Sequence, residues 1–199
     1  MDRLPILIAV LLALAPAGCN EKPSDASAPL ASRVDGVKAS SGKRRTAADF
    51  CDVLPAADKA PAFAMPPLTA AAPAAARGWR WVNFWATWCK PCIEELPLLG
   101  RWHERLQKAG RAVELVFVSV DDSDDALVDY KKQHADAPTS LRVADTQASM
   151  PGWLRSVGLD ENAPIPLHVL VDASGKVRCV RAGGLRDADY PIVEELIAR

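Results

Sequence analysis

The hydrophobic pattern of the chain becomes regular only from about residue 79 onward. Residues 79–85 are rich in β-forming side chains, and residues 113–121 make a nearly unbroken apolar run, as expected of a strand buried on both faces. Between them, residues 90–110 carry apolar side chains at helical spacing and end in glycine, which indicates a helix. The same signals predict helices over 122–135, around 150–158 and over 187–199, and a hairpin of two strands over 167–172 and 177–183. This order predicts an α/β fold with a central sheet of mixed direction flanked by helices.

The residues before position 79 lack such patterns and are rich in alanine and proline. Residues 1–18 combine Arg3 with an apolar run that is shorter than the ~20 residues of a spanning helix, so they predict a signal peptide. Residues 19–48 hold mostly Ser, Ala, Pro and charged side chains, which bury too little surface to offset the entropy of ordering, so we expect a flexible tether. The compact domain is expected over 49–199, entered through an extended stretch at 59–68.

Composition and charge limit the class of partner. The chain has 199 residues and is 49% hydrophobic, which is enough for a substantial core. Its 24 Lys and Arg residues balance 25 Asp and Glu residues, which leaves a formal net charge of −1. Without an excess of basic side chains, nucleic acid is not an expected partner. We expect the domain to act as a monomer.

The stretch FWATWCKPCIEELP at residues 84–97 carries the clearest candidate chemistry, because it holds Cys89 and Cys92 two residues apart. Such a pair can bind a metal, form an inert disulfide, or switch between dithiol and disulfide. A structural zinc site usually needs four ligands, and the chain has no second such pair and only three scattered histidines. A structural disulfide across so short a loop would constrain the unfolded chain only weakly. The redox switch is therefore the favoured interpretation.

The end of the predicted signal peptide suggests a lipid anchor. Ala17 and Gly18 directly before Cys19 resemble a bacterial lipobox, although Pro16 stands where that motif usually has leucine. The resemblance implies lipidation of Cys19 and an extracytoplasmic, periplasmic location on a bacterial membrane. The alternatives are a cleaved signal with an incidental cysteine and a retained membrane helix.

Export changes how the remaining cysteines are interpreted, because disulfides persist outside the cytoplasm. If Cys19 carries the lipid and Cys89 pairs with Cys92, then Cys51 and Cys179 are left to form a structural disulfide. The alternative is two isolated thiols.

The motif and its context resemble a known family. WATWCKPC at 85–92, with Glu95 and Pro97 after it, and NAPIPLHVLVDASGKV at 162–177 are similar to the TlpA/ResA branch of extracytoplasmic thiol-disulfide oxidoreductases. APAF at 60–63 is similar to the entry of that domain. The resemblance covers roughly residues 55–199 and implies a thioredoxin-like fold.

The resemblance and the local chemistry together assign roles to four residues. Cys89 is expected at the start of a helix, where the helix dipole stabilises a thiolate that attacks a disulfide, and Cys92 then resolves the mixed disulfide. Pro166 stands where the family has a cis-proline facing the cysteines. Glu95 matches a family glutamate beside the dithiol that exchanges a proton with Cys92, whereas a solvated helix glutamate is the plainer alternative. In cytoplasmic thioredoxins a buried aspartate on the strand before the motif takes the place of this glutamate. This chain has Asn83 at the position of that aspartate.

The implied function is reduction of disulfides in exported proteins, of the kind needed for cytochrome c maturation or copper-site assembly. This function needs protein substrates that contain disulfides and a membrane thiol oxidoreductase that supplies electrons. It requires no soluble cofactor. One alternative is a disulfide oxidase or isomerase of the same fold. Another is a Cu(I) chaperone that uses Cys89, Cys92 and His168, since thiolates and imidazole suit that metal. A core histidine is the plainer interpretation of His168.

Overall fold

The computed structural model describes residues 44–74 and 76–198. The predicted signal peptide, the lipidation site at Cys19 and all but the end of the predicted tether lie outside the described residues. Within the described ranges, no helix has both the length and the apolar character needed to cross a bilayer.

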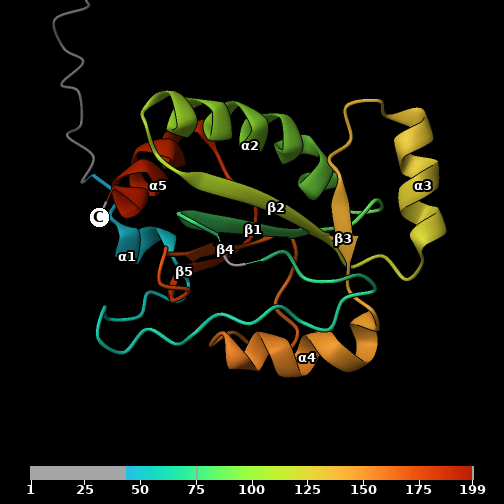
Figure 1. Cartoon of the computed structure of the whole chain (residues 1–199), viewed down its shortest axis with the longest axis horizontal. Coiled ribbons are helices and arrows are strands. Elements are labelled where there is room, and N and C mark those ends of the chain that lie inside the picture. Colours follow the sequence, from blue (N-terminus) through green and yellow to red (C-terminus); the bar gives the residue numbers. More distant parts are fainter. Residues whose placement is uncertain (1–43, 75, 199) are drawn as a thin grey trace, which may run out of the picture. The chain divides into compact units, whose positions relative to one another are not determined.

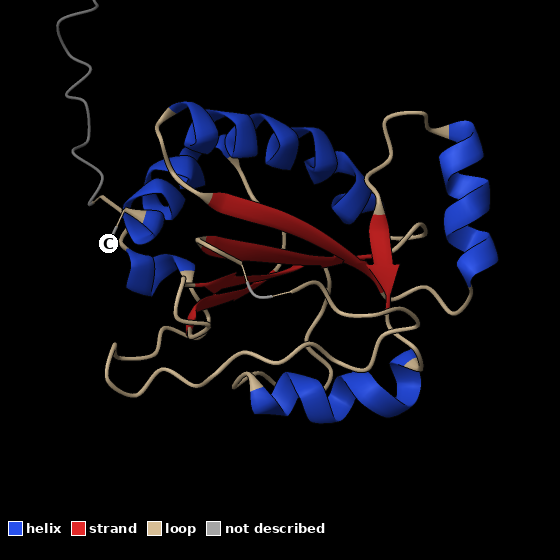
Figure 2. Cartoon of the chain, viewed as in Figure 1, coloured by secondary structure: helices blue, strands red, loops and turns tan. Residues whose placement is uncertain are grey.

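The centre of the fold is a sheet of five strands in the order β3-β2-β1-β4-β5 (Figure 2). The strands are β1 Trp79–Trp85, β2 Val113–Ser119, β3 Ser140–Arg142, β4 Leu167–Val171 and β5 Val177–Ala182. β1 and β3 pair with β2 in parallel, while β4 is antiparallel to both β1 and β5. The sheet is therefore of mixed direction, as the order of elements predicts, and β1 lies at its middle.

Helices cover both faces of this sheet (Figure 1). The long helix α2 and the C-terminal helix α5 lie over one face, α4 lies over the other, and α3 stands beside the edge strand β3. Their bounds are α1 Ala47–Phe50, α2 Lys90–Lys108, α3 Asp124–Gln133, α4 Thr146–Ser156 and α5 Tyr190–Ile197, with a 3-10 turn at Asp187–Asp189.

Alternate residues of β1 point into two separate apolar layers, because side chains of a strand alternate between the faces of its sheet. Val82 and Phe84 pack in the layer under α4, which includes Trp153. Trp81 packs in the layer under α2 and α5, next to Trp102. Each large side chain that is fully buried in these layers stabilises the fold by about 1.5–3 kcal/mol.

Three local features differ from the sequence-based expectation. The strand β2 is not buried on both faces throughout, since Glu114 is exposed. The helix α4 begins at Thr146 rather than near residue 150, because the Asp145 side chain accepts the N–H of Ala148 at 2.9 Å and caps the helix there. The short elements α1 and β3 were not predicted.

The segment after α1 is tied to the edge strand β5. Cys51 and Cys179 form a disulfide, and both are buried. Next to it, Val53 and Val180 exchange backbone hydrogen bonds of 3.1 and 2.9 Å. The disulfide therefore closes a loop of 128 residues that contains the whole sheet up to β5.

Replacing Cys51 and Cys179 together by alanine should lower the free energy of unfolding by about 3–5 kcal/mol, because closing a long loop removes much entropy from the unfolded chain. The measurement is urea denaturation followed by tryptophan fluorescence. The matched control replaces Cys89 and Cys92, whose sequence separation is only 3, and should cost about 2 kcal/mol in the same chain-entropy estimate. Equal losses in the two variants would contradict this account.

Candidate active site

The two cysteines of the CxxC motif lie where β1 gives way to α2. Cys89 is the N-cap residue of α2, and the N–H of Cys92 donates to Sγ of Cys89 at 3.3 Å. The two sulfur atoms are joined in a disulfide, with Cys89 5% exposed and Cys92 fully buried. Once the disulfide is reduced, the free N–H groups and the dipole of α2 favour a thiolate at Cys89. The more exposed cysteine is thus the one with the better-stabilised thiolate.

The two tryptophans before the cysteines have opposite environments. Trp85 is fully buried, and its Nε1 donates to Oγ of Ser140 at 3.0 Å. Trp88, directly before Cys89, is 68% exposed. Beyond the motif, Lys90 and Glu94 are also exposed and form a loose ion pair of 3.7 Å. Trp88 is therefore a large apolar surface beside the nucleophile candidate.

A buried carboxylate holds the turn that leads into the cysteines. Asp121 is 1% exposed and accepts hydrogen bonds from the N–H and hydroxyl of Thr87, the latter at 2.7 Å. The hydroxyl of Ser119 donates to the other oxygen at 2.6 Å. The sequence pattern did not single out Asp121 as a site residue, although an aspartate directly after an apolar strand is a signal for one. Asp121 ties the end of β2 to the turn before Cys89.

Pro166 is buried, and the peptide bond between Ile165 and Pro166 is cis. Because Leu167 pairs with Phe84, Pro166 lies at the end of β1 from which the cysteine turn departs. Its carbonyl accepts the N–H of Gly183 at 2.8 Å. Gly183 has φ of +104°, a conformation that favours glycine.

Glu95 is a buried residue rather than a solvated helix glutamate. Its side chain is 4% exposed, and it follows Cys92 by one turn on the same face of α2. Oε1 accepts from Nδ2 of Asn83 at 3.1 Å, and Oε2 accepts from the N–H of Leu185 at 3.1 Å. Nε2 of His168 lies 3.2 Å from Oε1. A carboxyl group is thus held inside the protein, next to the buried cysteine.

His168 does not point to the cysteines. Its Nδ1 faces Nε1 of Trp81 and Nδ2 of Asn83, both at 3.3 Å, and its Nε2 faces Glu95. No group of three or more His, Cys, Asp or Glu side chains among the described residues is arranged to hold a metal ion. The Cu(I) site that the sequence suggested for Cys89, Cys92 and His168 therefore finds no support, because both ring nitrogens are directed at other groups.

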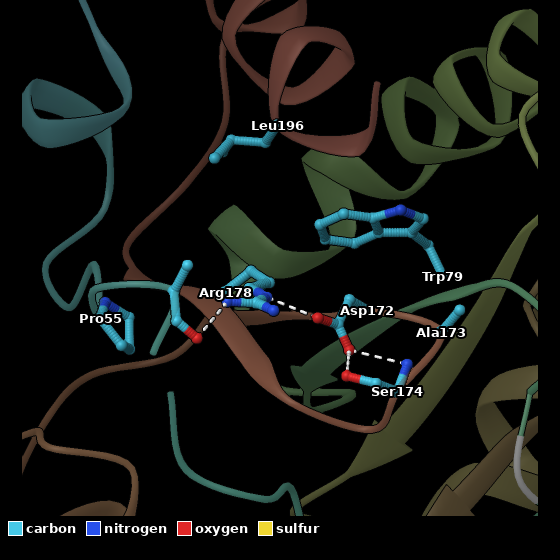
Figure 3. A pocket seen from close by; sticks show the side chains of 8 residues that line it. Pro55, Trp79, Asp172, Ala173, Ser174, Arg178 and Leu196 are labelled. Carbon is cyan, nitrogen blue, oxygen red and sulfur yellow. Dashed lines mark hydrogen bonds and ion pairs between the residues drawn. The ribbon is translucent and has the colours of Figure 1, made fainter. Parts of the chain in front are cut away.

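A second polar feature lies at the opposite end of β1, in a pocket of about 450 Å³ (Figure 3). Trp79 lines this pocket and begins β1, so the pocket is on the order of 20 Å from the cysteines. Burial alone would raise the pKa of Asp172, but hydrogen bonds from Ser174, Lys176 and Arg178 outweigh it and lower the pKa to about 2. The Arg178 guanidinium also donates to the Ala57 carbonyl, so this group fixes the β4–β5 turn against the entry segment.

The substitution Asp172→Asn should lower the free energy of unfolding by about 2 kcal/mol near pH 7. The pKa of Asp172 is lower in the folded protein than its ordinary value of 3.8, so its stabilising effect is present above that value. The effect disappears as the pH falls through about 2, the folded-state pKa. Urea denaturation at several pH values measures the difference from wild type, with the exposed Asp58→Asn as control. A difference that grows on acidification would contradict the prediction.

Comparisons with known proteins agree with this geometry. Residues 56–180 match the AhpC/TSA family. The thiol-disulfide oxidoreductase ResA of Bacillus cereus is 29% identical over 96 residues, which are 48% of this chain and 50% of that protein. A thiol:disulfide interchange protein DsbE homolog of Paracoccus denitrificans is 31% identical over 113 residues, covering 57% of this chain and 55% of its own length. The chain thus spans about half the length of the curated relatives it matches.

The solved structures add evidence about the fold. A crystal structure of a putative thiol:disulfide interchange protein DsbE from Chlorobium tepidum aligns with a TM-score of 0.52 at 24% identity, over 73% of this chain and 97% of that one. The expected α/β, thioredoxin-like fold is thereby confirmed. With a family match that extends over more than half of its length, the chain belongs to the AhpC/TSA family.

Proposed function

We propose that this protein is a thiol-disulfide oxidoreductase that reduces disulfides in exported proteins through Cys89 and Cys92. The observation that carries the proposal is the disulfide at the N-terminus of α2, with the buried carboxyl group of Glu95 one turn beyond it. The names of the relatives from Bacillus cereus and Paracoccus denitrificans also support this type of reaction.

The first step is attack by the Cys89 thiolate on a substrate disulfide. A bond forms between Sγ of Cys89 and one substrate sulfur, the substrate S–S bond breaks, and the other sulfur leaves as a thiolate. The N–H of Cys92 that faces Sγ of Cys89 stabilises the attacking anion. The exposed ring of Trp88 offers the substrate an apolar contact beside the nucleophile.

In the second step Cys92 resolves the mixed disulfide. Its thiol gives up a proton, its sulfur bonds to Sγ of Cys89, and the second substrate thiolate leaves. Two electrons have then passed from the protein dithiol to the substrate. Because Cys92 is fully buried, water cannot easily take its proton, and Glu95 is the acidic side chain placed one turn away.

The setting of this reaction is part of the proposal. The protein is held at a bacterial membrane by a lipid on Cys19 and works outside the cytoplasm as a monomer. Its substrates are cysteine pairs of apocytochrome c or of a copper site, and a membrane thiol oxidoreductase restores the dithiol. The buried Cys51–Cys179 disulfide supports an oxidising compartment, since such bonds are rare in the cytosol.

A Cys92→Ala variant should hold its substrates as mixed disulfides on Cys89, because the resolving thiol is gone while the attacking thiolate remains. The measurement is non-reducing gel electrophoresis of extracts from cells that express the variant, followed by mass spectrometry of the adducts. The matched control, Cys92→Ala with Cys89→Ala, should hold none. Adducts that persist in the double variant would exclude Cys89 as the nucleophile.

The direction of electron flow is tested by the reduction potential of the Cys89–Cys92 pair. A reductase should have a potential below about −200 mV, measured by equilibration with glutathione of known redox ratio. A value near about −120 mV, typical of a strong oxidant, would instead assign the chain to the disulfide oxidases of the same fold.

A further inference from the structure

A cluster of four buried side chains lies between the strand pair β1–β4 and the helix α2. Asn83 and His168 are direct neighbours across the β1–β4 pair, and Trp81 stands on the same face two residues before Asn83. Glu95 reaches this group from α2. His168 is 2% exposed, yet the proposed reaction assigns it no task.

The partners of His168 determine which ring nitrogen carries the proton. The indole Nε1 of Trp81 can only donate, and it faces Nδ1 of His168 at 3.3 Å. The amide Nδ2 of Asn83 is a second donor at 3.3 Å from the same atom. Nδ1 therefore accepts, and the hydrogen of a neutral ring lies on Nε2, the atom that faces Glu95.

Arg181 approaches His168 from the neighbouring strand β5. Arg181 lies directly opposite His168 in the β4–β5 pair, so their Cβ atoms are about 5 Å apart. The guanidinium of Arg181 donates to the carbonyl of Phe50 at 3.0 Å. A hydrogen on Nδ1 would point at the N–H of Trp81, so the geometry favours the tautomer with its hydrogen on Nε2.

We propose that His168 is a positioning residue for the proton transfer at Cys92, and that its neutral imidazole holds the Glu95 carboxylate in place with the hydrogen on Nε2. This inference rests on the proposed function. Nε2 lies 3.2 Å from Oε1 of Glu95, but its N–H does not point along the line to that oxygen, so the contact is electrostatic rather than an aligned hydrogen bond.

The remaining contacts of Glu95 agree with this role. Asn83 donates to Oε1, and the N–H of Leu185 donates to Oε2. N–H donors thus reach both oxygens of Glu95, which holds the carboxyl group in a fixed orientation one turn from Cys92. In the resolution step the proton of Cys92 moves to this carboxylate as the Cys92 sulfur bonds to Cys89, and reduction of the disulfide returns it.

Other titratable groups near the cluster are paired elsewhere. On the 3-10 turn and on α5, Asp189 pairs with Arg45, and Glu194 accepts the hydroxyl of Tyr190. The titratable or charged residues that the strand register and the helix place beside Glu95 and His168 include Cys92 on α2 and Arg181 on β5.

The test separates the two steps of the reaction. Fully reduced protein is mixed with dithiobis(nitrobenzoate) in a stopped-flow instrument, and each step releases one coloured thiolate. In His168→Phe, the release from the second step should slow about tenfold, and the acid limb of its pH profile should move up by about one pH unit. The first step should stay within about twofold of wild type, because attack by the Cys89 thiolate involves no proton transfer to Glu95.

Three matched variants make the result specific. His168→Gln keeps an N–H group near Glu95 and should restore the second step. His134→Phe removes an exposed histidine at the end of α3 and should change neither step. In a Glu95→Gln background, adding His168→Phe should cause no further slowing, because the group that it positions is gone.

The outcomes distinguish the inference from the function on which it rests. If His168→Phe slows both steps equally, or lowers the urea midpoint while the second step keeps its wild-type pH profile, His168 is only structural. If wild-type protein releases no thiolate at all, the proposed function itself fails. Nitrogen NMR of the His168 ring in wild-type protein gives an independent check, and a hydrogen on Nδ1 would overturn the assignment.

Discussion

The antiparallel pairing of β4 with β1 is the constraint from which the whole site follows. β1 lies at the middle of the sheet and leads directly into the turn that carries Cys89. Because Phe84 pairs with Leu167, the proline loop before β4 must arrive at that same end of β1. The next pair in register, Asn83 with His168, then faces the first turns of α2. One strand pairing therefore positions the cysteines, the proline and the buried polar cluster at once.

The burial of the Glu95 carboxyl group on this face of the sheet is tolerable because its hydrogen-bond partners are built into neighbouring elements. An unpaired buried carboxylate would cost several kcal/mol. Glu95 avoids this cost by accepting from Asn83 on β1 and from the backbone of Leu185 after β5. The segment from Gly183 to Leu185 also bonds to the carbonyl of Pro166, so the same few residues support both the proline loop and the glutamate. Small shifts of this segment would move both groups together.

Much of the fold could be predicted from local patterns, and the exceptions have physical causes. β1, α2 and the β4–β5 hairpin are long or strongly patterned, so their local sequence is enough to predict them. β3 is three half-buried residues whose only regular partner is β2, so it exists through a long-range pairing that no local pattern encodes. In the site, the cysteine motif was visible in the sequence. The contacts of His168 were not, because they depend on the register of β4 against β1.

The chain carries the buried acidic residue that follows Cys92 on α2 instead of at position 83 of the central strand, and Asn83 is what makes this arrangement consistent. A carboxylate at position 83 would stand about 3 Å from Oε1 of Glu95, judged from the present 3.1 Å contact of the amide, and two buried carboxylates at that distance repel strongly. The amide instead donates to Glu95 and to His168 with one nitrogen. It thereby links the carboxylate and the imidazole without adding a charge of its own. Asn83 therefore does not replace the catalytic role of a strand aspartate. It is the neutral hydrogen-bonding partner of both Glu95 on α2 and His168 on β4.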